Sequence, residues 1–209
     1  MPEKLNVILI AMLSLVFLSM YEKGDDKEPT NSNLRVSQIA GKSLFDLKKC
    51  VNCHTLAEKD EGELTPVTNK RDDDWFAEHV EKESPIVLRE ESSKRKQRRV
   101  LGAEIKALAD YLYESKPEEK KQIDEMSENV FYGAYLIYQN SCLNCHSIAG
   151  MGKDVGPDLS HVGKKHKKDW FIENFKNPQQ FAPESVMPKF NHLPEEDLEK
   201  MAEYLLTLK

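Results

Sequence analysis

The sequence predicts an all-α protein in which two tandem modules follow one N-terminal transmembrane helix. Three observations lead to this fold class. Residues 5–21 form the only long apolar stretch of the 209-residue chain, and a sequence pattern repeats at a spacing of a little over 90 residues. The repeated segments have helical periodicity and almost no alternating β-branched runs. By the usual range of roughly 100–200 residues per domain, this length allows one or two domains.

The apolar stretch, LNVILIAMLSLVFLSMY, has 17 residues and no charge. A membrane-spanning helix needs roughly 17–25 residues, so the stretch lies at the short end of this range. A cleaved signal peptide is the alternative, but the stretch ends without a small-residue cleavage site. A lysine precedes it and acidic residues follow it, which favours an N-terminus on the inside. We therefore expect a single-pass, uncleaved membrane anchor in the lipid bilayer at residues 1–21 and a polar tether at residues 22–33.

The charge of the chain argues against nucleic acid as a partner. The sequence is 32% charged, with a formal net charge of −6. Two basic runs, KRKQRR at residues 94–99 and KKHKK at residues 164–168, are local. We interpret them as solvated faces or as docking patches for an acidic partner.

The repeat divides the remaining chain into two similar parts. The segments EIKALADYLYESK (104–116) and DLEKMAEYLLTLK (197–209) match at an offset of 93 residues. We predict module 1 at residues 34–116, a charged linker at 117–126 and module 2 at 127–209. The repeat also pairs single residues at matching positions: Gly41 with Gly133, Cys50 with Cys142, Trp75 with Trp170, and Tyr111 with Tyr204.

All four cysteines belong to two copies of one motif, CVNCH (50–54) and CLNCH (142–146). Two cysteines three residues apart reach one face of a turn, and the next histidine points over it; C-x-x-C-H is typical of c-type haem attachment. A zinc site needs four ligands within one small fold, whereas these pairs lie 92 residues apart, and a thioredoxin-like pair needs a βαβ context. We predict two covalently attached haem c groups, held by two residue sets: Cys50, Cys53 and His54, and Cys142, Cys145 and His146.

With these motifs, the chain resembles a dihaem class I cytochrome c with an N-terminal membrane anchor. The resemblance covers roughly residues 34–209. It is more specific in module 2, where five short motifs follow the order of the family: CLNCH, GPDL (156–159), DW (169–170), KNP (176–178) and MPKF (187–190).

The resemblance implies roles for several residues near the haem. The carbonyl of Pro157 would accept a hydrogen bond from His146, and Leu159 would pack on the haem. Trp170, and Trp75 at the matching position of module 1, would lie at the haem, where Trp170 would donate its indole N–H toward a propionate. Gly133 and Tyr204 would mark the crossing of the first and last helices of module 2.

Met187 is the predicted sixth ligand of the haem in module 2. A thioether favours ferrous iron and raises the reduction potential, and histidine with methionine is the usual ligand pair of an electron carrier. Met187 follows Pro178 by nine residues, the spacing that the family uses for this ligand. The other methionines of this module lie on the proximal loop and at a core position of the last helix.

Module 1 cannot supply such a thioether, because no methionine lies between residues 20 and 126. Three sixth ligands stay open for this haem. His79 lies four residues after Trp75 on the same predicted helix, Lys94 stands at the position of Met187 in the 93-residue register, and the third possibility is an open or water-bound iron. A nitrogen ligand would give the haem of module 1 the lower potential.

These features favour an electron-transfer subunit over an enzyme. Cytochrome c maturation attaches haem outside the cytoplasm, so the haem modules are expected on the periplasmic or extracytoplasmic side of the cytoplasmic membrane. The resemblance implies the cytochrome c subunit of a quinol-oxidising cytochrome bc-type or related respiratory or photosynthetic complex, with a cytochrome b and a redox protein as donor or acceptor. A dihaem oxidoreductase, of peroxidase or thiosulfate dehydrogenase type with haem 1 as the reactive centre, is the alternative. A haem-based sensor would usually carry an output domain, which we do not find in the sequence.

Overall fold

The computed structural model describes residues 34–52, 54, 73–83 and 94–209, and in these ranges the protein is mostly helical, as predicted. None of the described helices is long and apolar enough to cross a membrane, and the anchor predicted at residues 1–21 lies outside the described residues. The helices are α2 (Val36–Leu47), α3 (Asp73–Glu83), α4 (Lys94–Leu112), α5 (Pro117–Asp124), α6 (Glu128–Gln139), α7 (Lys168–Lys176) and α8 (Glu195–Leu206).

Short elements complete the described chain. The strands β1 (Ser147–Ile148) and β2 (Met151–Gly152) form one antiparallel pair, in which Ser147 faces Gly152. Four 3₁₀ turns lie between the helices: η2 (Cys50–Asn52), η4 (Cys142–Asn144), η5 (Val162–Lys164) and η6 (Pro178–Gln180).

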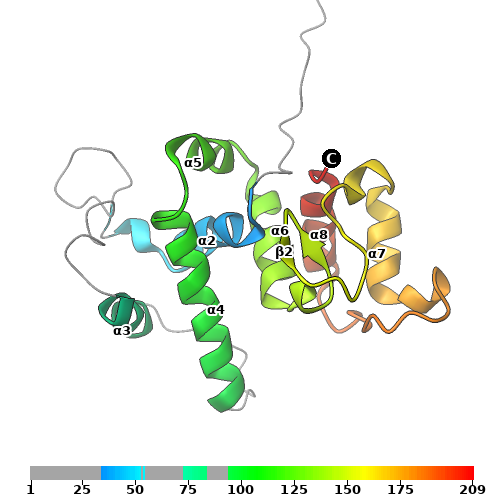
Figure 1. The fold of residues 1–209 in the computed structure, drawn as a ribbon, viewed down its shortest axis with the longest axis horizontal. Helices are drawn as coiled ribbons and strands as arrows, with labels where there is room; N and C mark the ends of the chain where they lie inside the picture. The colour runs from blue at the N-terminus through cyan, green and yellow to red at the C-terminus, as the bar shows by residue number, and fades with distance from the viewer. Residues whose placement is uncertain (1–33, 53, 55–72, 84–93) are drawn as a thin grey trace, which may run out of the picture.

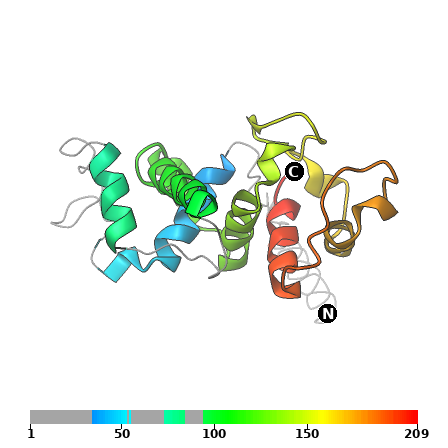
Figure 2. The same ribbon diagram turned by 90° about the horizontal axis from the view of Figure 1, so that it is seen from below.

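Two helix pairs form the body of the structure (Figure 1). Helix α2 packs against α4, which we call the first helix pair, and α6 packs against α8, which we call the second helix pair. The two pairs lie side by side because α2 also packs against α6, so these two helices stand in the middle in both views (Figures 1 and 2).

Each pair crosses at a glycine that the repeat singled out. A Cβ atom on Gly41 would lie 2.1 Å from the Ala107 carbonyl oxygen, and one on Gly133 would lie 2.0 Å from the Lys200 carbonyl oxygen. Only glycine permits such contact between two backbones, because any side chain would occupy the space of the other helix. The tyrosines of the repeat, Tyr111 and Tyr204, are completely buried at these crossings, as expected for Gly133 and Tyr204.

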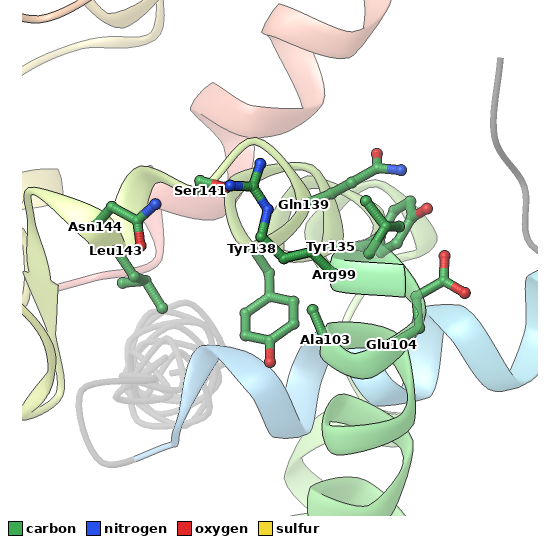
Figure 3. A pocket seen from close by; sticks show the side chains of 10 residues that line it. Arg99, Ala103, Glu104, Tyr135, Tyr138, Gln139, Ser141, Leu143 and Asn144 are labelled. Atoms are coloured by element: carbon green, nitrogen blue, oxygen red, sulfur yellow. The ribbon is translucent and has the colours of Figure 1, made fainter. Parts of the chain in front are cut away.

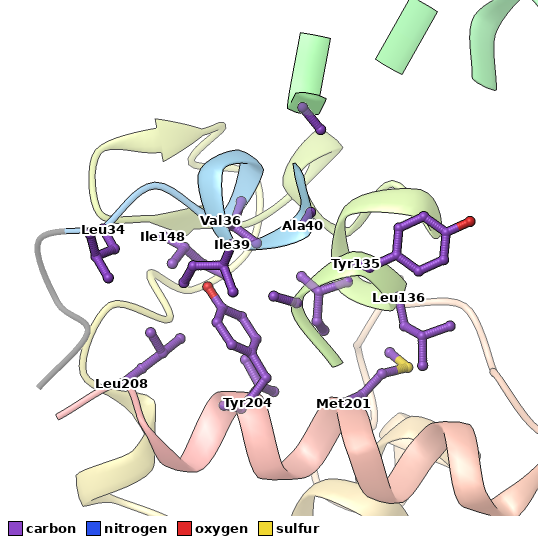
Figure 4. Packing of buried hydrophobic residues seen from close by; sticks show 14 of the residues in the cluster. Leu34, Val36, Ile39, Ala40, Tyr135, Leu136, Ile148, Met201, Tyr204 and Leu208 are labelled. Atoms are coloured by element: carbon purple, nitrogen blue, oxygen red, sulfur yellow. The ribbon is translucent and has the colours of Figure 1, made fainter. Parts of the chain in front are cut away.

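The core is continuous between the two pairs (Figure 4). Ile39 of α2, Ile148 of β1 and Tyr204 of α8 belong to one buried cluster. A polar contact also joins them, since the Ser37 hydroxyl lies 3.7 Å from the sulfur of Met151 and donates a hydrogen bond to Asp110. The two pairs therefore share buried surface, which fixes one against the other.

The segment predicted as a charged linker at residues 117–126 contains helix α5. Pro117 stands at its first position, where its missing N–H costs nothing. Glu119 accepts a hydrogen bond from the Lys116 N–H at 2.9 Å and another from the Gln38 side chain at 3.0 Å. Ile123 is completely buried. The high charge of this segment hid its single apolar anchor, and the cap and the contact with α2 stabilise the helix.

The crossing of the second helix pair gives a stability prediction. Gly133→Ala should lower the free energy of unfolding by about 1–3 kcal/mol, because the added methyl group overlaps the backbone of α8 and forces the helices apart. Thermal and urea unfolding followed by circular dichroism measure the change. Gly102→Ala in α4 is the matched control, since nothing lies within 4 Å of its added Cβ. This variant should be up to about 1 kcal/mol more stable through helix propensity. Equal effects of the two variants would contradict the close crossing.

Candidate functional site

The second cysteine motif forms a tight turn directly after α6. Ser141 takes a left-handed conformation with φ 62°, which ends the helix and turns the chain. Inside η4, the N–H groups of Cys145 and His146 both donate to the Cys142 carbonyl oxygen, at 3.1 and 2.9 Å. This turn brings the second cysteine and the histidine back toward the first cysteine. Cys142 and Cys145 are free thiols, and burial raises the pKa of the Cys142 thiol to about 12.

The first cysteine motif has the same turn after α2. Lys49 takes the left-handed conformation with φ 56°, at the position that Ser141 occupies in the other motif. The His54 N–H donates to the Cys50 carbonyl oxygen at 3.0 Å, as His146 does to Cys142. Cys50 is a free thiol, and Cys53 lies outside the described residues. A left-handed non-glycine residue is uncommon, so its presence before both motifs shows that the turns are equivalent.

The ring of His146 is held in one orientation. Its Nδ1 lies 2.8 Å from the Pro157 carbonyl oxygen, which is the contact that the resemblance implies. With Nδ1–H as donor, Nε2 carries a lone pair and can bind a metal. A Cβ atom on Gly156 would lie 2.7–3.3 Å from the imidazole, so the backbone passes directly along the ring. Leu159 is partly buried against the core, and its N–H donates to the Ser147 carbonyl oxygen at 2.8 Å.

The loop that carries Met187 is tied down by hydrogen bonds. The side-chain amide of Gln179 donates to the carbonyl oxygens of Ser185 and Met187, at 2.9 and 3.2 Å. The Met187 N–H donates to the Ser185 hydroxyl at 3.2 Å. Met187 packs against the core, whereas the neighbouring Val186 is 86% exposed. The loop therefore turns the thioether inward. Gln179 and Ser185 belong to no motif, so the sequence did not predict their roles.

Trp170 belongs to an aromatic group beside this loop. Its ring stacks on His166 with the centroids 3.4 Å apart and an interplanar angle of 9°. It also contacts Phe181 and Phe171, with centroid distances of 5.1 and 5.5 Å. His166, from the basic run KKHKK, was not predicted as a partner; its spacing of four residues from Trp170 was the available signal.

The first helix pair places His79 close to the first motif. The ring centroids of His54 and His79 are 5.9 Å apart, and the two planes stand at 80°. Trp75 stacks on His79 with a centroid distance of 5.0 Å. Burial lowers the pKa of His54, and the charge of His79 lowers it further, so both causes favour the neutral imidazole that binds metals. Lys94 is the first residue of α4, and its side chain is not among those described.

These residues fit a haem c group. Haem c needs two thiols and an imidazole with a free, oriented nitrogen, and the turn at Cys142 with the fixed ring of His146 provides them. Gly156 leaves room for the imidazole itself, which a side chain at this position would fill. The second helix pair thus carries the donor set of a c-type cytochrome.

Comparisons with known proteins lead to the same class. Residues 127–207 match the family model described as "Cytochrome C oxidase, mono-heme subunit/FixO". The chain is 29% identical over 97 residues to cytochrome c oxidase subunit 2 of Alkalihalophilus pseudofirmus, covering 42% of this chain and 28% of that protein. No solved structure gives a significant match.

Subunits of nitric oxide reductase are a second kind of relative. The one from Stutzerimonas stutzeri is 33% identical over 93 residues, which cover 42% of this chain and 63% of the relative. The one from Paracoccus denitrificans is 27% identical over 97 residues, which cover 41% and 64%. The chain thus spans less than two thirds of each of these relatives. Together with the geometry, the similarity identifies residues 127–207 as a segment of c-type cytochrome character, with haem c as its cofactor.

The hydrogen bonds of Gln179 give a prediction for the Met187 loop. Gln179→Ala removes both side-chain donors, each worth about 1 kcal/mol, so amide hydrogen exchange in residues 185–190 should become about five to thirty times faster. Exchange followed by mass spectrometry measures this rate. Gln180→Ala is the matched control, because Gln180 is exposed on the same turn. Unchanged exchange in Gln179→Ala would mean that the loop is held by its packing alone.

Proposed function

We propose that the protein is a membrane-anchored dihaem c-type cytochrome that carries single electrons as a subunit of a membrane electron-transfer complex. The anchor comprises residues 1–21 and the tether residues 22–33. Residues 34–116 and 127–209 each form a class I cytochrome c module with one haem. The modules face the extracytoplasmic side.

The equivalence of the two motif turns is the observation that carries this proposal. Both turns follow a helix that crosses its partner at a glycine, and both begin with a left-handed residue. The histidine N–H bonds back to the first cysteine in each turn. Because the second turn lies in the segment that matches a mono-haem family, an equivalent first turn supports a second haem.

We assign His146 and Met187 as axial ligands of the second haem, and His54 and His79 as those of the first. Two imidazoles on opposite sides of one iron, each about 2 Å from it, have ring centroids roughly 6 Å apart. The distance of 5.9 Å between His54 and His79 agrees with this requirement. In the second module, the inward-turned thioether supports Met187. Since thioether favours ferrous iron more than imidazole does, the first haem should have the lower potential.

The relatives support a role within a larger complex. The matched proteins of nitric oxide reductase and of cytochrome c oxidase are, by their names, subunits of redox enzymes. By analogy, the proposed partners are a membrane subunit such as a cytochrome b and a redox protein that donates or accepts electrons. A quinol-oxidising complex is one form of this proposal.

A dihaem oxidoreductase would need one iron with an open position for substrate. The approach of His79 to His54 argues against an open first haem, and Met187 against an open second haem. The electron carrier is therefore the function that the geometry supports best.

The haem content tests the proposed cofactor. The purified protein should carry two haems that acid–acetone does not extract, because thioether bonds hold them. The pyridine haemochrome spectrum counts them, and the double substitution Cys50→Ala and Cys53→Ala should leave one. A wild-type protein with one haem would overturn the dihaem proposal but not the c-type cytochrome itself.

The ligand state of the first haem tests the assignment of His79. His79→Ala should convert this haem from low-spin to high-spin and let it bind carbon monoxide, because the sixth position opens. Electron paramagnetic resonance and absorption spectra measure the change. Lys94→Ala is the control and should leave the spectrum unaltered. A spectrum that changes only in Lys94→Ala would move the assignment to lysine, and a first haem that is already high-spin in the wild type would favour the enzyme.

A further inference from the structure

A cavity of about 250 Å³ lies where the two helix pairs meet, between α4, α6 and the turn η4 (Figure 3). Leu143 and Asn144, the two residues between the cysteines of the second motif, stand at one end of it. Tyr135 and Glu104 stand at the other end, with Tyr138 between them. The cavity thus reaches from the second motif turn to a carboxylate on the first helix pair.

Glu104 forms a buried ion pair with Lys48. The Lys48 Nζ lies 2.9 Å from Glu104 Oε2, and the two side chains are 0% and 3% exposed. The contact lacks the angles of a hydrogen bond, and Oε1 has no hydrogen-bond partner among the described residues. Lys48 precedes Cys50 by two residues, at the end of α2. One charged pair therefore connects the segment of the first motif with the cavity beside the second.

Stability alone does not account for this pair. Removing two charges from water costs several kcal/mol per ion, and apolar residues of similar size are often as stable or more so. The effect of the Glu104 charge is visible at Tyr135, whose pKa is raised first by burial and then by Glu104. In a poorly polarisable interior, charges act over longer distances than in water. The haem potential is sensitive to such charges in its surroundings.

We propose that the Lys48–Glu104 pair is an electrostatic control element shared by the two haem sites, in which the Glu104 carboxylate offsets the positive charge of Lys48 near both attachment turns. This inference rests on the proposed dihaem function. Removing the carboxylate leaves the ammonium group unbalanced, and a positive charge favours the ferrous form of each haem, because that form carries one positive charge fewer.

The test is a potentiometric titration of the full-length, haem-loaded protein. Glu104→Gln should shift both reduction potentials upward. The double variant Lys48→Met with Glu104→Gln should return both to the wild-type values, because it removes both charges. Glu118→Gln, which removes an exposed carboxylate on α5, is the matched control and should leave both potentials unchanged.

The sign of the shift separates control of the potential from a purely structural role. Loosened packing admits water, which favours the more highly charged ferric form and lowers the potential. Lowered or unchanged potentials in Glu104→Gln, or a shift at one haem only, would overturn the proposal. The thermal midpoint gives an independent readout: it should fall in Glu104→Gln and recover in the double variant. If the wild-type protein carried one haem or none, the proposed dihaem function would fail in the haemochrome spectrum before any titration.

Discussion

The backbone contact between crossing helices is the constraint on which the rest of the structure depends. At Gly41 and at Gly133 the absence of a side chain lets one helix touch the backbone of the next. Each cysteine motif begins nine residues later, after the helix has ended in a left-handed residue. Because an α-helix is rigid and rises about 1.5 Å per residue, the crossing point fixes where each turn lies. The positions of the thiols and of the histidine therefore follow from a contact about 13 Å away along the helix.

From this common frame the two halves differ in what surrounds the histidine. In the second half, a proline carbonyl orients His146, and Gln179 and Ser185 hold the loop of Met187. In the first half, the nearest histidine comes from helix α3, where Trp75 stacks on His79. A loop needs several hydrogen bonds to hold a flexible thioether, whereas a helix presents an imidazole with its backbone already fixed. The different devices suit the different ligands that we assign.

The sequence was sufficient to predict the parts of the structure that are repeated or close in the chain. The glycine crossings and the turns at both motifs follow from local patterns, as does the contact between Pro157 and His146, which lie within one short segment. Helix α5 was missed because its stability comes from a cap and one buried isoleucine rather than from periodicity. Gln179 was missed because it acts through its amide on a loop, which no sequence motif records. The pair of Lys48 and Glu104 was beyond prediction, since charged residues 56 positions apart are ordinarily solvated.

The shared core between α2 and α6 gives this buried pair its significance. If the two helix pairs were separate domains on a tether, a charge in one would be screened by water from the other beyond about 10 Å. Here α2 packs directly against α6, and the cavity at their junction is bounded by Glu104 on one side and by the second motif turn on the other. Protein rather than bulk solvent separates the charge from both turns, so screening is weak in both directions. The packing that joins the halves is thus also the condition under which a single charged pair can act on two sites.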